Sequence, residues 1–252
     1  MDDPRPSALR TGPRGRGRVW KVACDKSLAR VRDRLRTPMP QNIEDPGMDG
    51  TAISSADAVE PGPAESSATE PRDLRFALRA ATDAAHRRLD AGFAAHDLSR
   101  RTDYATFLSA MRDPFVQIEA WLDGADAADL PPDWPARRRA DFLLADLRGL
   151  AIGAPDTLPE PLPQGLAGAE APGLLYVLEG SRLGGKVLLR QVLASSDPDV
   201  RGNARFLRHG EGARLWPSFA AWLATRPADA EAAAIRGALR AFALFETAQA
   251  RG

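Results

Sequence analysis

The chain has 252 residues, with 34 basic and 34 acidic side chains, so its formal net charge at pH 7 is zero. This balance argues against the overall basic character of a nucleic-acid-binding protein. A single cysteine, Cys24, excludes an intramolecular disulfide framework and a cysteine zinc cluster, and it favours a reducing cytoplasm. No apolar run reaches the roughly 18 residues of a membrane span, and the N-terminus lacks the apolar core of a signal peptide, so we expect neither a membrane span nor export.

Residues 1–70 differ in composition from the rest of the chain. Residues 1–38 carry an excess of Lys and Arg, whereas residues 39–71 carry Asp and Glu but no Lys or Arg. Neither part has a sustained apolar period, so neither can bury enough apolar surface to offset its conformational entropy. We predict a disordered tail over 1–70 and one helical domain over 71–252. The basic stretch of the tail either meets an anionic partner or membrane surface or is simply solvated.

Beyond residue 71 the apolar spacing is helical and strand signals are nearly absent, which predicts an all-α domain. Pro114 lies inside the second expected helix, where we expect it to interrupt and kink that helix. A region of this length can form a bundle with a cofactor pocket between two helices. The expected helices cover approximately residues 73–95, 101–122, 135–151, 172–195, 212–225 and 229–250.

The first expected helix contains a potential metal ligand, His86. Arg79 lies two turns before it and Asp90 one turn after it, so the three side chains share one helix face. A neutral imidazole binds a metal through one ring nitrogen while the other donates to a carboxylate, and Asp90 is placed to accept. The spacing is equally compatible with an ordinary surface or core histidine.

The expected helix over 172–195 is interrupted internally by Gly180, Gly184 and Gly185. Each interior glycine costs about 1 kcal/mol relative to alanine, so a compensating contact is expected. Gly180 and Gly184 clear one strip of helix surface of side chains, which suits either a flat ligand or close packing of a second helix.

Together the two segments resemble haem oxygenase. AATDAAHRRLD, which contains Thr82, His86 and Asp90, resembles the proximal helix of that family, and YVLEGSRLGGKVL resembles its glycine-containing distal helix. The resemblance covers about residues 72–250. The sequences of the two motifs are most similar to those of the bacterial branch often associated with phytochromes.

The resemblance implies a haem-oxygenase-like multi-helical bundle in which haem b, with its iron bound by His86, lies between the proximal and distal helices. It implies degradation of haem, with O2 and external electrons, to biliverdin, carbon monoxide and ferrous iron. The electron donor would be a ferredoxin or a reductase, and a bacteriophytochrome is a possible bilin acceptor. Two alternatives stay open: a non-catalytic haem carrier or sensor on the same fold, and a helical scaffold without haem.

The resemblance also assigns individual roles. Ser181 stands where many family members have an aspartate, and a hydroxyl hydrogen-bonds but carries no charge, which leaves the direction of attack on the porphyrin open. Arg182, with Lys186 and Arg190, either holds the haem propionates or forms a solvated basic face. The expected catalytic residues are Gly180, Ser181 and Gly184, and the expected cofactor-binding residues are Arg79, His86, Asp90, Gly180, Arg182, Gly184 and Gly185.

The two other histidines are not expected to bind iron. His96 lies ten positions after His86, about 280° around a continuing helix, so we expect it at the surface near the helix end. His209 lies beside Gly210 and Gly212, which predicts a turn. Aromatic residues at helical spacing are expected in the core, with one or two touching the porphyrin; they are Phe206, Trp216, Phe219, Trp222, Phe242 and Phe245.

Overall fold

The computed structural model describes residues 73–151, 159–162 and 165–251, and within these ranges it is helical and contains no strand. The predicted all-α class is therefore confirmed, whereas the prediction of a disordered tail over 1–70 falls outside the described residues. The α-helices are α2 (Leu74–Phe93), α3 (Arg101–Asp123), α4 (Ala140–Gly149), α5 (Ala171–Leu193), α6 (Pro198–Gly202), α7 (Arg205–Arg208), α8 (Leu215–Leu223) and α9 (Glu231–Gln249). The 3-10 helices are η2 (Ala127–Asp129), η3 (Trp134–Arg137), η4 (Gly168–Glu170) and η5 (Ala228–Ala230).

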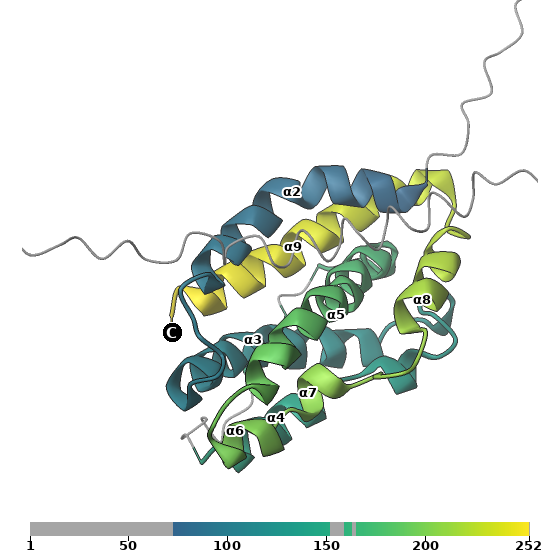
Figure 1. Ribbon diagram of the computed structural model, residues 1–252. Coiled ribbons are helices and arrows are strands. Elements are labelled where there is room, and N and C mark those ends of the chain that lie inside the picture. Colours follow the sequence, from purple (N-terminus) through teal and green to yellow (C-terminus); the bar gives the residue numbers. More distant parts are fainter. Residues whose placement is uncertain (1–72, 152–158, 163–164, 252) are drawn as a thin grey trace, which may run out of the picture.

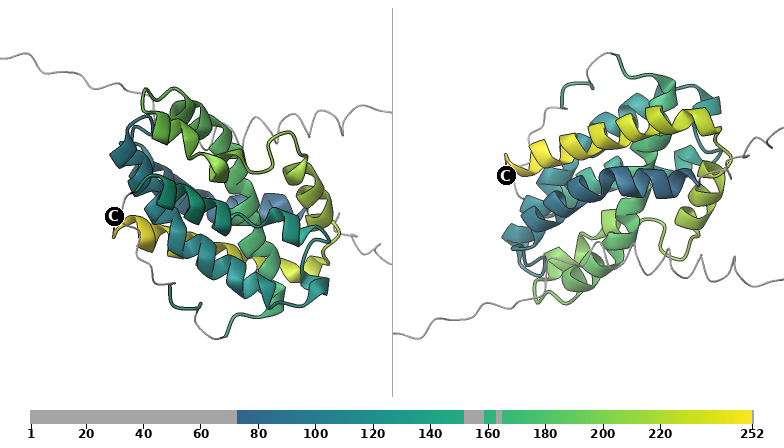
Figure 2. Two further views of the ribbon diagram at one scale, coloured as in Figure 1. Left: turned by 90° about the horizontal axis from the view of Figure 1, so that it is seen from below. Right: turned by 90° about the horizontal axis from the view of Figure 1, so that it is seen from above.

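Helix α9 lies beside α2 in the upper part of Figure 1, with α3 and α5 below it. It packs against α2, α3 and α5, and the two further views of Figure 2 show α2 running alongside it. Helices α4 and α7 pack against each other beneath α3 and α5, and α8 packs against α5. Among the described elements α2 and α5 both contact α9 extensively but contact each other little, which leaves room for a site between them.

Helix α2 begins where the side chain of Asp73 accepts a hydrogen bond from the backbone N–H of Arg75. Its buried stripe includes Leu78, Thr82 and Ala85, which recur at helical spacing. Because α2 packs chiefly against α9, this buried stripe is the side of α2 that contacts α9. The neighbouring side of α2, which carries His86 and Asp90, faces the cavity between α2 and α5.

The first turns of α5 pack backbone to backbone against α9. A Cβ atom on Gly173 would collide with the carbonyl oxygen of Ala234 and would lie 2.6 Å from the backbone nitrogen of Ala238. Likewise, a Cβ atom on Gly237 would collide with the carbonyl oxygen of Glu170. These two glycines therefore allow α5 and α9 to approach more closely than any larger residue permits.

The helix expected over 135–151 is in fact two elements. The 3-10 helix η3 ends at Arg137, and α4 begins at Ala140 after an extended residue. The buried carboxylate of Glu119 accepts hydrogen bonds from the backbone nitrogens of Arg139 and Ala140, at 2.8 and 2.9 Å, and so satisfies the start of α4.

Two further differences concern short or interrupted elements. Helices α6 and α7 span only five and four residues, too few to show an apolar period, and were not predicted. Helix α3 runs unbroken through Pro114, so the expected interruption there is wrong.

Candidate active site

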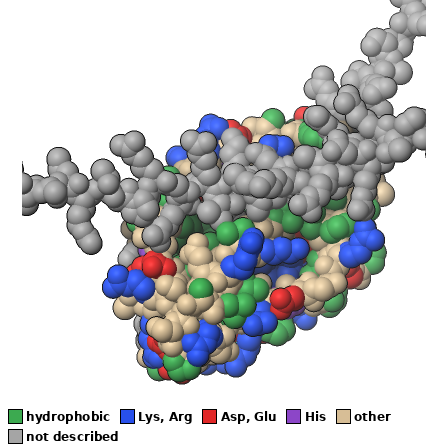
Figure 3. Space-filling model, viewed as in Figure 1, with side chains coloured by type: hydrophobic (Ala, Val, Ile, Leu, Met, Phe, Trp, Pro, Cys, Tyr) green, Lys and Arg blue, Asp and Glu red, His purple; other side chains and the backbone are tan. Residues whose placement is uncertain are grey.

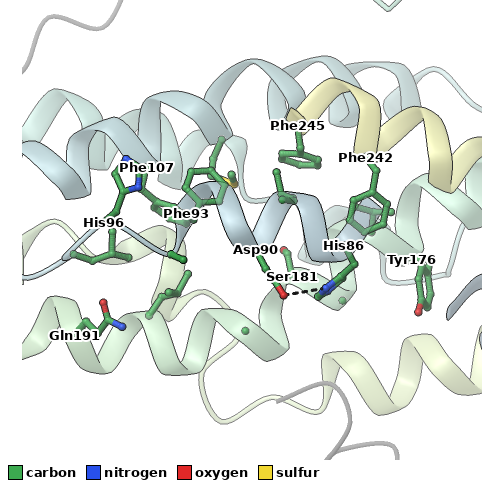
Figure 4. Close-up of a pocket in the computed structure, with 18 residues that line it drawn as sticks. His86, Asp90, Phe93, His96, Phe107, Tyr176, Ser181, Gln191, Phe242 and Phe245 are labelled. Atoms are coloured by element: carbon green, nitrogen blue, oxygen red, sulfur yellow. Dashed lines mark ion pairs between the residues drawn. The ribbon is translucent and has the colours of Figure 1, made fainter. Parts of the chain in front are cut away.

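A cavity lies between α2 and α5, with α9 along one side (Figure 4). Most of the residues that line it are apolar, and they come from α2, the loop after it, α3, α5 and α9. Phe242 and Phe245 of α9, two of the aromatic residues expected at helical spacing, are among them. The lining residues with polar side chains are His86, Asp90, His96, Tyr176, Ser181 and Gln191.

His86 and Asp90 both line the cavity, as their spacing on one helix predicts. The Nδ1 atom of His86 lies 3.3 Å from Oδ2 of Asp90, the pair joined by a dashed line in Figure 4. The ring of Phe242 packs edge to face against the imidazole, with 5.8 Å between centroids. A carboxylate beside Nδ1 favours the tautomer that carries its hydrogen there, so the lone pair available to a metal is on Nε2.

The glycines of α5 divide between two surroundings. Gly180 and Gly184 line the cavity, and a Cβ atom on Gly180 would meet only the Trp216 ring, at 3.9 Å, an ordinary contact. Close helix packing therefore does not explain Gly180. Gly185 is buried, and a Cβ atom there would lie 3.7 Å from the Leu207 side chain, so Gly185 faces α7. The structure does not support a contact between Gly185 and a ligand in the cavity.

Ser181 lines the cavity, and its hydroxyl takes part in two hydrogen bonds. It donates to the carbonyl oxygen of Leu178 at 2.6 Å and accepts a hydrogen bond from Arg139. The buried guanidinium of Arg139 stacks between the rings of Phe115 and Phe206, at 4.7 and 4.8 Å from their centroids. Burial lowers the pKa of Arg139. Sequence reasoning missed this arginine, because its contact joins the segment before α4 to α5, and the two residues are 42 positions apart in the chain.

Arg182 does not face the cavity. Its Nε donates to Glu179 at 3.0 Å, Nη1 lies 2.9 Å from Nδ1 of His209, and Nη2 donates to the carbonyl oxygen of Arg137 at 2.5 Å. The side chain is only 8% exposed, and burial lowers its pKa. The expected role of Arg182 in holding propionates is therefore not supported, since its donors are committed to a buried network.

The same network includes residues that the sequence did not single out. Glu179 lies between two arginines, because Nη1 of Arg137 donates to its other carboxylate oxygen at 2.8 Å. Arg137 also donates to the hydroxyl of Ser218 at 2.8 Å. Burial, followed by the charge of Arg182, lowers the pKa of His209 to about 4, so this histidine is neutral and accepts. The network fixes α5 from the side away from the cavity.

His96 lines the cavity, contrary to its expected place at the surface. Helix α2 ends at Phe93, so the angular argument for a continuing helix does not apply, and the chain turns back with the backbone N–H of His96 donating to the carbonyl of Phe93. The His96 ring packs edge to face on the ring of Phe93. Its Nδ1 atom is buried and has no hydrogen-bond partner in the described part of the chain.

The remaining basic candidates lie outside the cavity. Arg79 is on α2, two turns before His86, and is not among the described residues that line the cavity. Lys186 and Arg190 are exposed, and Nε of Arg190 lies 3.4 Å from the carbonyl oxygen of Lys186. The face shown in Figure 3 has Lys and Arg side chains dispersed among hydrophobic and acidic ones. For Lys186 and Arg190 the structure favours the solvated face.

The described residues contain no group of three or more His, Cys, Asp or Glu side chains arranged to hold a metal ion. None of the described helices combines the length and apolar character needed to cross a membrane.

Comparison with known proteins finds no matching family model. A curated protein of Xanthomonas campestris pv. campestris named Heme oxygenase is 37% identical over 118 residues, which cover 45% of this chain and 68% of that protein. Heme oxygenase PigA of Pseudomonas aeruginosa is 32% identical over 149 residues, which cover 58% of this chain and 75% of PigA. A crystal structure of the NO- and CO-bound heme oxygenase from Neisseria meningitidis matches with a TM-score of 0.58 and 27% identity, over 71% of this chain and 92% of that one.

Proposed function

The chain belongs to the haem oxygenase family and is an enzyme that degrades haem, and from this we propose that His86 is the iron ligand and that the cavity between α2 and α5 holds the substrate. One observation carries the proposal: His86, paired with Asp90, faces a cavity whose opposite wall is formed by Gly180, Ser181 and Gly184. The products we propose are biliverdin, carbon monoxide and ferrous iron.

The residues present suit haem. The cavity wall is mainly apolar, as the faces of a macrocycle require, and Gly180 brings backbone rather than side chain to it. Asp90 and the ring of Phe242 together restrict the orientation of the His86 imidazole. When bound, haem supplies both the iron that activates molecular oxygen and the carbon that is oxidised.

The chain's own contribution on the α5 side comes from Ser181. Its hydroxyl hydrogen is directed to Leu178 and one lone pair accepts from Arg139, so the remaining lone pair can accept a hydrogen bond from a water in the cavity. A water held in this way keeps its second hydrogen to donate towards the reacting centre. Arg139 thus positions Ser181 as an acceptor, and the water takes the place of the carboxylate that many family members have there.

We also propose that Arg79 pairs with a propionate. It lies on the His86 face of α2, two turns before His86. A guanidinium there would set the rotation of the macrocycle in its plane and hence the meso carbon that is oxidised. Arg79→Ala should weaken hemin affinity and broaden the distribution of biliverdin isomers, and an unchanged affinity would contradict this role.

Haem oxygenases need an external electron donor. We propose a ferredoxin or a reductase as that donor and a bacteriophytochrome as a possible acceptor of the bilin. We further propose that residues 71–252 form the catalytic domain and that the tail over 1–70 is dispensable for turnover.

The proposal is tested by adding hemin to the purified protein, recording the Soret band, and then adding a reductant in air. We expect a Soret complex followed by biliverdin absorption. A Soret complex without bilin would indicate a haem carrier or sensor, an alternative that the relatives do not favour. No Soret complex would indicate a scaffold, and either result would contradict the proposed enzyme.

A further inference from the structure

Two polar side chains line one end of the cavity, away from His86. His96 comes from the loop after α2 and Gln191 from the last turns of α5, and Figure 4 labels both at the end opposite Tyr176. Most of the other residues that line the cavity are apolar, Phe93, Leu98 and Leu188 among them. Neither side chain takes part in the iron site described above.

The imidazole of His96 has a ring nitrogen whose hydrogen-bonding capacity is unsatisfied in the described part of the chain. Its Nδ1 atom is buried without a partner among the described residues, and an unsatisfied buried polar atom is unfavourable. His96 also lines the cavity, so a ligand there that carries a complementary polar group can pair with its imidazole. Gln191 adds a carboxamide, which carries two donor hydrogens and one acceptor oxygen.

Haem itself does not supply that polar group at this end. With its propionates towards Arg79, the opposite edge of the macrocycle carries only methyl and vinyl substituents and a meso C–H. This edge would point towards His96 and Gln191, because Arg79 precedes His86 on α2 whereas His96 follows it.

The bilin formed when the haem ring opens does carry polar groups at this edge. Oxidation at the meso carbon opposite the propionates leaves two lactams at this edge, each with an N–H beside a carbonyl. A carboxamide can form paired hydrogen bonds with a lactam, and an imidazole ring offers nitrogens that can donate to the lactam carbonyl or accept from its N–H. We propose that His96 and Gln191 form a product subsite that recognises the lactam edge of the bilin and not the haem from which it is made.

This inference rests on the proposed function and on Arg79 marking the propionate end. It implies that the enzyme holds its product through contacts that do not exist before the ring opens. It also selects one isomer, biliverdin opened at the meso carbon opposite the propionates, because only that isomer presents both lactams to this end of the cavity.

The test compares the affinities of the full chain for that biliverdin isomer and for hemin, by absorbance titration without a reductant. His96→Leu and Gln191→Leu should each weaken bilin binding about tenfold, as expected for one lost hydrogen bond. Hemin affinity and the Soret position should change less than twofold. His96→Asn, whose amide can occupy the place of Nδ1, should restore most of the bilin affinity, and circular dichroism should show that each variant is folded.

Bilin binding by both leucine variants as tight as that of the natural chain would overturn the subsite, and so would an equal loss of hemin and bilin affinity. Failure of the natural chain to bind this bilin would overturn it as well. Failure of the proposed function has a different signature, since it appears as the absence of a Soret complex in the natural chain.

Discussion

Gly173 and Gly180 lie seven residues apart on α5, yet their surroundings are opposite. A Cβ atom on Gly173 would collide with the backbone of α9, whereas one on Gly180 would touch a single ring carbon of Trp216 at ordinary contact distance. The first glycine is required by the packing of two helices. The second borders the cavity that faces His86, where we propose that haem lies.

The comparison shows that a glycine inside a helix has at least two physical explanations, which the sequence alone does not separate. Close packing requires that the backbone of another element occupy the place of the Cβ atom. A ligand site requires that this place be open to a cavity. The two cases differ in what a methyl group would change, since the first substitution acts on folding and the second on binding.

The largest effect is expected for Gly173→Ala. The added methyl group meets the carbonyl of Ala234 in a helix that cannot move without disturbing α2 and α3, so the free energy of unfolding should fall by about 3 kcal/mol. Urea unfolding measures this loss. A stability equal to that of the natural chain would show that α5 and α9 are not in backbone contact here.

Gly180→Ala is the matched variant at the cavity. Its stability should stay the same or rise by up to about 1 kcal/mol, because alanine is the better helix former and no backbone atom opposes its Cβ. Hemin affinity should fall about tenfold, since the methyl group takes space that the macrocycle needs. Hemin titration beside urea unfolding separates the two effects, and a variant that is less stable yet binds hemin normally would reverse the assignment.

Ser181→Ala should slow bilin formation while leaving hemin affinity nearly unchanged. It also removes the acceptor of a buried Arg139 hydrogen, which should lower the free energy of unfolding by about 1–3 kcal/mol. Ser218→Ala is the control, because Ser218 likewise accepts from a buried arginine, Arg137, but lies outside the cavity. If both variants lost turnover equally, Ser181 would have only a structural role.

A smaller effect concerns the network behind α5. The pKa of His209 is about 4 in the folded chain, below its ordinary value of 6.5, so between these values the unfolded chain binds a proton that the folded chain does not. The free energy of unfolding should therefore decrease as the pH falls from about 6.5 to about 4, and less steeply in His209→Gln. Unfolding curves at pH 7 and pH 5 measure the difference, and identical pH dependence in the two proteins would exclude this contribution.

The parts of the site that the sequence predicts are the local ones. His86 and Asp90 are fixed relative to each other by helix geometry, and Gly180, Ser181 and Gly184 are fixed in the same way on α5. His96 was misplaced because its position depends on α2 ending at Phe93, two residues earlier than expected.

The parts that the sequence did not predict depend on contacts between distant segments. The contact of Arg139 with Ser181 joins the segment before α4 to α5, and nothing in the local pattern of three successive arginines separates a buried one from a solvated one. Arg182 was wrongly assigned to the site because the local sequence also does not show which of its neighbours bind its guanidinium. Its spacing places it on a helix face, but only the packed fold shows that Glu179, Arg137 and His209 occupy its hydrogen-bonding atoms.

The assignment of the iron ligand is the central claim, and the ferric hemin spectrum of His86→Ala tests it most directly. His209→Ala, which alters a histidine outside the cavity, is the control. We expect His86→Ala to lose the Soret band of the natural complex and to form no bilin, with added imidazole partly restoring the spectrum, while His209→Ala retains both. A spectrum and bilin yield of His86→Ala equal to those of the natural chain would show that another group binds the iron.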